Sequence, residues 1–246
     1  MTVAIVALLT VLAITGAHAA EVKVAVAANF TEAAREIGAL FEKTSGDKVV
    51  FSFGSTGQLY TQITQDAPFD VFLSADGARP EKAEKEGYAA PGSRFTYATG
   101  KIVLFSMDKQ AVHSEATLKS AKFAKLAICN PITAPYGAAS VEAMKALGVY
   151  DALKDKLVQG ENISQAYQFV ATGNAEVGFV ALSQVARDPD KGSRWIVPSN
   201  LYKPIAQDAI LLKRGADNPA AKAFIAFLKG KEAHAVIEKF GYGTGG

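Results

Sequence analysis

Four short segments of the sequence combine small, uncharged residues with a position between a predicted strand and a predicted helix. They are Ala27–Phe30, Gly54–Gly57, Asn130–Ala138 and Asn162–Ser164. A helix N-terminus leaves backbone N–H groups without intrahelical acceptors and carries the positive end of the helix dipole. Small residues let an anion approach those groups closely. The chemistry that this pattern indicates is anion binding by backbone donors.

None of the four segments contains a lysine or an arginine. An anion bound there would be neutralised by dipoles and hydrogen bonds instead of ion pairs. Each segment alone is also what an ordinary helix cap looks like, because small polar residues are the usual N-caps. The four segments form a binding site only if the tertiary structure brings them together.

The sequence gives less support to a catalytic site than to an anion-binding site. Gly54–Gly57 lacks the lysine and the longer spacing of a P-loop, and no G-x-S-x-G nucleophile elbow occurs. His113 and His234 are isolated and give neither a zinc spacing nor a general base. Asp70 and Asp76 flank a strand, where cap or turn roles are favoured. We expect a binding protein without a catalytic residue, cofactor or resident metal, and an exported hydrolase is the alternative.

The elements that position these segments follow from hydrophobic patterning. Short apolar runs alternate with amphipathic stretches, which predicts βαβ units and parallel sheets. About ten strands are many for one sheet, so two lobes with a cleft between them are expected. The main predicted strands are 23–27, 49–53, 70–74, 101–106, 126–129, 177–181 and 195–197, and the main predicted helices are 31–44, 58–65, 218–228 and 232–240.

The composition fits an exported two-lobed protein. The chain has 246 residues and a net charge of +2, which excludes a strongly basic nucleic-acid surface. Its first 20 residues contain no charged side chain, and their apolar run Val3–Ile14 is too short for a membrane span. Ala17 and Ala19 stand where a signal peptidase reads, so residues 1–19 are predicted to be a signal peptide. Cys129 is the single cysteine and is predicted to be a buried small hydrophobe.

At the same four segments the sequence resembles the periplasmic molybdate-binding protein family, the substrate-binding component of molybdate ABC transporters. The resemblance covers essentially the whole mature chain and rests on collinear motifs, none of which is specific alone. These motifs are Ala27–Phe30, Ser52–Gly57, Ala67–Asp76, Pro91–Ala98, Asn130-Pro131 with Ala134–Gly137, and Gly178–Ala181.

The resemblance implies an α/β fold of the type II periplasmic binding protein class. Each lobe would be a mostly parallel sheet flanked by helices, and two strands near 97–100 and 204–208 would cross between the lobes. The first lobe would comprise 20–99 and 205–246, and the second 100–204. The family further implies a monomeric periplasmic protein that closes on a small oxyanion and delivers it to a membrane permease.

Family binding residues match four positions of this chain. Asn29 matches a contact residue, and Thr56 matches a serine that gives both its N–H and its hydroxyl. Tyr136 and Ile163 match positions that give a backbone N–H.

Two further positions, Ala28 and Ser55, are weaker candidates for the same site. Some members of the family carry Thr at the position of Ala28, and some carry a ligand-binding tyrosine at the position of Ala181. Two hydroxyl donors known in the family are therefore absent from this chain, and the number of donors differs from that of those members.

Molybdate or tungstate, as the fully ionised dianion, is the expected ligand. Hydrogen phosphate would press its O–H against N–H donors, and sulfate would have to be rejected by its size. A receptor for sulfate or phosphate is the alternative within the same class. A receptor for a ferric complex would want several tyrosines or carboxylates, and only Tyr136 lies in the four segments.

The signal sequence gives the first prediction. The mature protein should begin near Ala20 or Glu21, because the cleavage motif ends at Ala19. Intact mass spectrometry of the periplasmic fraction measures this directly. A full-length chain that retains Met1 and sediments with membranes would contradict the prediction.

Overall fold

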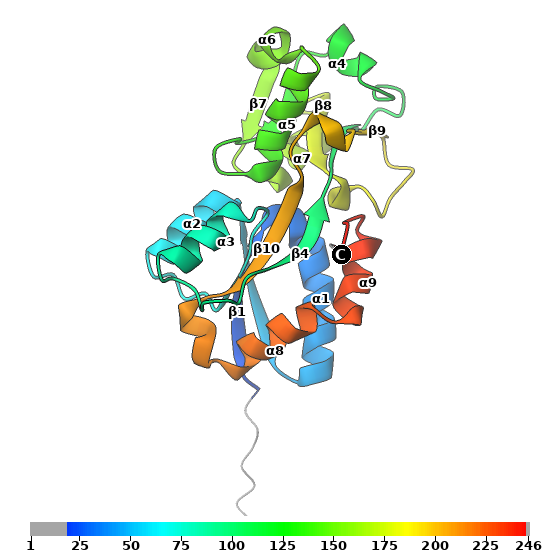
Figure 1. Cartoon of the computed structure of the whole chain (residues 1–246). Helices are drawn as coiled ribbons and strands as arrows, with labels where there is room; N and C mark the ends of the chain where they lie inside the picture. The colour runs from blue at the N-terminus through cyan, green and yellow to red at the C-terminus, as the bar shows by residue number, and fades with distance from the viewer. Residues whose placement is uncertain (1–18, 245–246) are drawn as a thin grey trace, which may run out of the picture.

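The computed structural model describes residues 19–244 and shows two lobes, each built on a five-stranded sheet (Figure 1). The predicted signal peptide lies outside the described residues, apart from Ala19. In the part of the chain that is described, no helix combines the length and the apolar character needed to cross a membrane.

The first sheet has the strand order β2-β1-β3-β10-β4. Strand β1 pairs in parallel with β2 and β3, whereas β10 is antiparallel to β3 and β4. Side chains of β1 alternate between two cores: Val24 packs with α1, α8 and α9, and Ala25 packs with α2 and α3. The bounds are β1 Glu21–Ala27, α1 Thr31–Ser45, β2 Lys48–Gly54, α2 Thr56–Thr64, β3 Val71–Leu73, α3 Ala78–Lys85, β4 Phe95–Gly100, β10 Ile205–Leu211, α8 Pro219–Leu228 and α9 Lys231–Lys239.

The second sheet has the order β7-β6-β8-β5-β9. Strand β6 is parallel to β7 and β8, and β5 is antiparallel to β8 and β9. Leu104 packs in the core beneath α5, and Phe105 packs on the other face with Val170 of α7. The bounds are β5 Ile102–Ser106, α4 Ala116–Ser120, β6 Leu126–Cys129, α5 Pro135–Ala146, α6 Tyr150–Leu153, β7 Leu157–Gly160, α7 Ile163–Ala171, β8 Val177–Ala181 and β9 Ser193–Ile196.

The chain passes between the lobes at β4 and at β10, close to the predicted crossings (Figure 1). The expectation of mostly parallel sheets holds for three strands of each sheet, and the other two strands pair antiparallel. In the first sheet, the reason is that β4 leaves the lobe and β10 returns to it, so these two strands run in opposite directions. The domain limits at 99/100 and 204/205 stay a prediction.

The predicted elements match the observed ones where hydrophobic patterning is strong. Strands β6 and β8 have the predicted bounds, and Cys129 is buried as predicted, with its burial raising the pKa of the thiol to about 12. Strand β7 and helix α3 were not predicted. The reason is that β7 is a four-residue edge strand and α3 is polar and contains Pro80.

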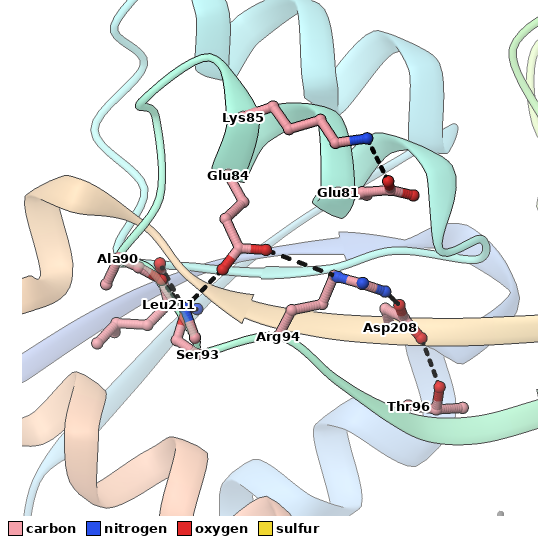
Figure 2. Close-up of polar contacts among 10 residues, drawn as sticks. Glu81, Glu84, Lys85, Ala90, Ser93, Arg94, Thr96, Asp208 and Leu211 are labelled. Carbon is pink, nitrogen blue, oxygen red and sulfur yellow. Dashed lines mark hydrogen bonds and ion pairs between the residues drawn. The ribbon is translucent and has the colours of Figure 1, made fainter.

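A buried carboxylate holds the second crossing strand to the first (Figure 2). Asp208 of β10 is only 3 % exposed. Its Oδ2 accepts a hydrogen bond from Arg94 at 2.7 Å, and its Oδ1 accepts one from the Thr96 hydroxyl at 2.7 Å. Glu84 of α3 lies 3.9 Å from the Arg94 Nε, so the guanidinium also joins α3 to the crossing strands.

Replacing Asp208 should therefore destabilise the fold. Asp208→Ala leaves the Arg94 and Thr96 donors without their acceptor and should cost about 1–3 kcal/mol. Thermal or urea unfolding measures the loss. Asp151→Ala is the matched control, because that side chain is 92 % exposed. Equal stability of the two variants would show that the buried carboxylate does not fasten the crossing strands.

Candidate functional site

The four small-residue segments converge on one cavity between the lobes. All six predicted site residues line it, together with residues that flank them and with Ala75, which follows β3. The lining residues are Ala27, Ala28, Asn29, Gly54, Ser55, Thr56, Ala75, Ala134, Pro135, Tyr136, Asn162 and Ile163. Contact of these residues with a ligand stays a prediction.

Helix α2 leaves one backbone N–H of its first turn free. Ser55 caps the helix, and its hydroxyl oxygen accepts from the Gln58 N–H at 3.4 Å. The Gly57 N–H donates to the Thr133 carbonyl of the other lobe at 2.8 Å. Among the hydrogen bonds of residues 19–244, none uses the Thr56 N–H, which can therefore serve a ligand.

Helix α7 repeats this arrangement on the second lobe. The Asn162 Oδ1 accepts from the Ser164 N–H at 3.0 Å and from the Gln165 N–H at 3.1 Å. Within the described chain, no acceptor meets the remaining first-turn N–H, that of Ile163. The cap thus satisfies its neighbours and leaves this single donor at the cavity.

Helix α5 also leaves one N–H of its first turn free, and a proline contributes to this. Pro135 has no N–H, and the N–H groups of Gly137 and Ala138 donate to the Ala134 carbonyl at 2.9 and 3.2 Å. The N–H of Tyr136 has no acceptor in the part of the chain that the structure covers. Three helices from two lobes therefore bring one free N–H each to one cavity.

The side chain of Thr56 adds a hydroxyl to these donors. Thr56 is 1 % exposed, and its Oγ1 accepts from the Ala75 N–H at 3.0 Å. Because a hydroxyl oxygen that already accepts still carries its own hydrogen, the O–H is left to donate into the cavity.

The electrostatics of the cavity come from backbone dipoles. No Asp, Glu, Lys or Arg is among the residues that line it. The nearby Arg79 pairs with Asp76 and donates to the Ile132 carbonyl across the cleft at 2.9 Å. The positive ends of three helices thus face a cavity that contains no charged side chain, which suits a small anion.

Several hydrogen bonds across the cleft show that the lobes are closed. Besides the bonds from Gly57 and Arg79, the Gln58 side chain donates to Glu161 at 2.9 Å, and the Ser164 hydroxyl donates to the Ala28 carbonyl at 3.3 Å. A Cβ added to Gly57 would lie 3.0 Å from the Thr133 Cα. The absence of a side chain at Gly57 therefore permits the close approach of the two lobes.

Comparison with known proteins identifies the family of this chain. The family described as bacterial extracellular solute-binding protein matches residues 22–243. The chain is 58 % identical to the molybdate-binding protein ModA of Rhodobacter capsulatus, covering 93 % of this chain and 90 % of that one. It is 56 % identical to the ModA of Azotobacter vinelandii, covering 92 % and 91 %. A solved periplasmic molybdate-binding protein of Azotobacter vinelandii superposes with a TM-score of 0.88 at 40 % identity, covering 92 % of this chain and all of that one.

The chain belongs to the periplasmic molybdate-binding protein family.

The structure places Ala28 and Ala181 differently with respect to the cavity. Ala28 lines the cavity, so a hydroxyl at this position is absent from the site itself. Ala181 is fully buried at the end of β8, its N–H donates to the Gln184 side chain at 3.0 Å, and it does not line the cavity.

Asn29 lies between the cavity and a buried polar cluster that the sequence did not reveal. Its Nδ2 donates to the Gln207 Oε1 at 2.6 Å and to the Tyr242 hydroxyl at 3.0 Å, and it lies 3.3 Å from the Tyr136 hydroxyl. The Asn29 carbonyl accepts from the hydroxyls of Ser183 and Tyr242. Gln207, Tyr242 and Ser183 belong to no motif, so no local signal could have identified them.

Proposed function

We propose that the protein is a periplasmic receptor that captures molybdate or tungstate between its lobes and delivers the anion to the permease of an ABC transporter. The observation that carries the proposal is the convergence of the Thr56, Tyr136 and Ile163 N–H groups on a cavity without charged side chains. In this proposal Asn29 and the Thr56 hydroxyl add side-chain donors, and Ala28 and Ser55 shape the wall. The protein acts as a monomer and catalyses no reaction.

The donor set favours a fully ionised tetrahedral anion. Hydrogen bonds to a charged acceptor are short and strong, and a dianion with four oxygens can accept all of those that the cavity offers. Hydrogen phosphate carries an O–H that would meet N–H donors and leave both groups unpaired, which disfavours it. Sulfate has the right charge, so the size of the cavity must discriminate against it. The relatives named as molybdate-binding proteins support the larger oxyanions.

A panel of oxyanions tests the proposal. Molybdate and tungstate should bind in calorimetry and raise the melting temperature, and sulfate and phosphate should do so far less. A ligand at about 1,000 times its dissociation constant adds about 4 kcal/mol to the free energy of unfolding. Equal shifts with sulfate would show that the claim of size selection is wrong.

Substitutions of Thr56 test the site itself. Thr56→Ala removes the hydroxyl and should weaken molybdate binding about 10- to 200-fold, because one hydrogen bond to a charged partner contributes about 1.5–3 kcal/mol. Thr56→Ser is the matched control, since it keeps the hydroxyl and should bind nearly as the wild type does. Thr56→Asp should abolish binding, because its carboxylate would face a dianion. Calorimetry gives the affinities, and circular dichroism shows that the variants are folded.

The Thr56→Asp variant is the decisive member of this series. A folded Thr56→Asp protein with unchanged molybdate affinity would rule out this cavity as the site. The receptor function would then have to be placed elsewhere in the molecule.

A further inference from the structure

The side-chain amides of Asn29 and Gln207 face each other in the interior, directly behind the cavity. Asn29 is 4 % exposed, Gln207 is fully buried, and the Asn29 Nδ2 lies 2.6 Å from the Gln207 Oε1. Asn29 lines the cavity and Gln207 does not. Gln207 therefore acts on the cavity only through Asn29 or another intermediate residue.

An amide pair of this kind has two complementary arrangements. Each amide has one donor end and one acceptor end, and a hydrogen bond forms only if a donor faces an acceptor. The observed arrangement places the Asn29 Nδ2 against the Gln207 Oε1. Turning both amides by half a rotation places the Asn29 Oδ1 against the Gln207 Nε2 and keeps the hydrogen bond. Turning only one amide breaks it, so the two must turn together.

The groups around the pair accept either arrangement, because they are hydroxyls. Tyr242 lies 3.0 Å from the Asn29 Nδ2, Tyr136 lies 3.4 Å from the Gln207 Nε2, and Tyr97 lies 3.4 Å from the Gln207 Oε1. Each hydroxyl can donate or accept. Tyr242 gives its hydrogen to the Asn29 carbonyl in the observed arrangement, and it can turn this hydrogen to the Oδ1 in the reversed one because the Ser183 hydroxyl also donates to that carbonyl. Burial raises the pKa of Tyr97, Tyr136 and Tyr242, so all three keep their protons at neutral pH.

The two arrangements differ in what they offer to an anion. The end of the Asn29 amide that does not bind Gln207 is the end left for the cavity. In the observed arrangement this end is Oδ1, which accepts no hydrogen bond from any residue in 19–244, and we infer that it is the end of the amide nearer the cavity that Asn29 lines. An oxygen there repels a dianion, whereas in the reversed arrangement the Nδ2 would donate to it. An anion in the cavity must therefore favour the reversed arrangement.

We propose that Gln207 is a positioning residue that sets which end of the Asn29 amide faces the anion, by turning its own amide together with that of Asn29. This inference rests on the proposed oxyanion site. Gln207 has a fixed position from which to act, because the next residue, Asp208, is held by Arg94 and Thr96 (Figure 2). The proposed role of Gln207 needs a side chain with both a donor end and an acceptor end. A carboxylate only accepts, and an apolar side chain does neither.

A double-mutant cycle tests the inference. Gln207→Glu, assayed at a pH at which the new buried carboxyl is ionised, puts an acceptor-only group opposite Asn29, which holds the Nδ2 inward and leaves the Oδ1 for the anion. Molybdate affinity, measured by calorimetry, should fall about 10- to 100-fold, the size of one lost charge-assisted hydrogen bond. In the Asn29→Ala background the same substitution should cost less than about threefold, because there is no amide left to orient.

A second double-mutant cycle uses Gln207→Leu in place of Gln207→Glu, so that no charge is buried. It should cause a smaller loss than Gln207→Glu in the wild-type background and almost none in the Asn29→Ala background. Melting temperatures of the ligand-free proteins show which variants are folded. A merely structural role would lower affinity equally in both backgrounds.

Two results would overturn the inference. One is that Gln207→Glu and Gln207→Leu lower molybdate affinity in the Asn29→Ala background as much as they do in the wild-type background. Gln207 would then affect the anion without acting through Asn29. The other is wild-type affinity in both single variants of Gln207. Failure of the wild-type protein to bind molybdate would instead contradict the proposed function, so the two failures are distinguishable.

Discussion

A helix N-terminus must find acceptors for its first backbone N–H groups, and this requirement organises the cleft. Helices α2, α5 and α7 satisfy their other first-turn donors through the Ser55 hydroxyl, the Thr133 carbonyl of the other lobe, the Ala134 carbonyl and the Asn162 side chain. Each then leaves one N–H at the cavity. In the proposed function, an anion between the closed lobes would supply the acceptors that these three groups lack. Donors from both lobes meet only when the cleft is shut, so binding at the proposed site would be coupled to lobe closure.

The neutrality of the cavity is as important as its donors. A lysine or an arginine there would attract any small anion, protonated or not, and would gain most of its energy from charge alone. Oriented N–H groups instead require an acceptor at each position, so they discriminate by the number and placement of lone pairs. The charged residues near the mouth of the cleft pair with each other or bridge the lobes, as Arg79 does with Asp76 and the Ile132 carbonyl.

The crossing strand β10 contributes to two polar clusters, one of which lies behind the cavity. On β10 the neighbours Gln207 and Asp208 lie at a break in the strand register, and they serve two different polar clusters. Asp208 ties β10 to β4 through Arg94 and Thr96, whereas Gln207 meets the Asn29 amide behind the cavity. Gly100 of β4 leaves room for the Tyr136 hydroxyl, which a Cβ at that position would approach to 2.1 Å. The contacts between the two crossing strands and the contacts behind the cavity are therefore made by adjacent residues of β10.

The sequence by itself determined the parts of this protein that depend on local interactions. Hydrophobic patterning located most strands and helices, and small residues after strands marked the capped helix ends that leave Thr56, Tyr136 and Ile163 at the cavity. Edge strand β7 and the polar helix α3 gave too little pattern to be predicted. Only the tertiary structure decided that the four junctions meet, and only it paired Asn29 with Gln207, which are 178 residues apart. The physical reason is that a helix cap is formed within a few residues and leaves a signal in the sequence, whereas a hydrogen bond between distant side chains has no periodicity and exists only once the two lobes have packed.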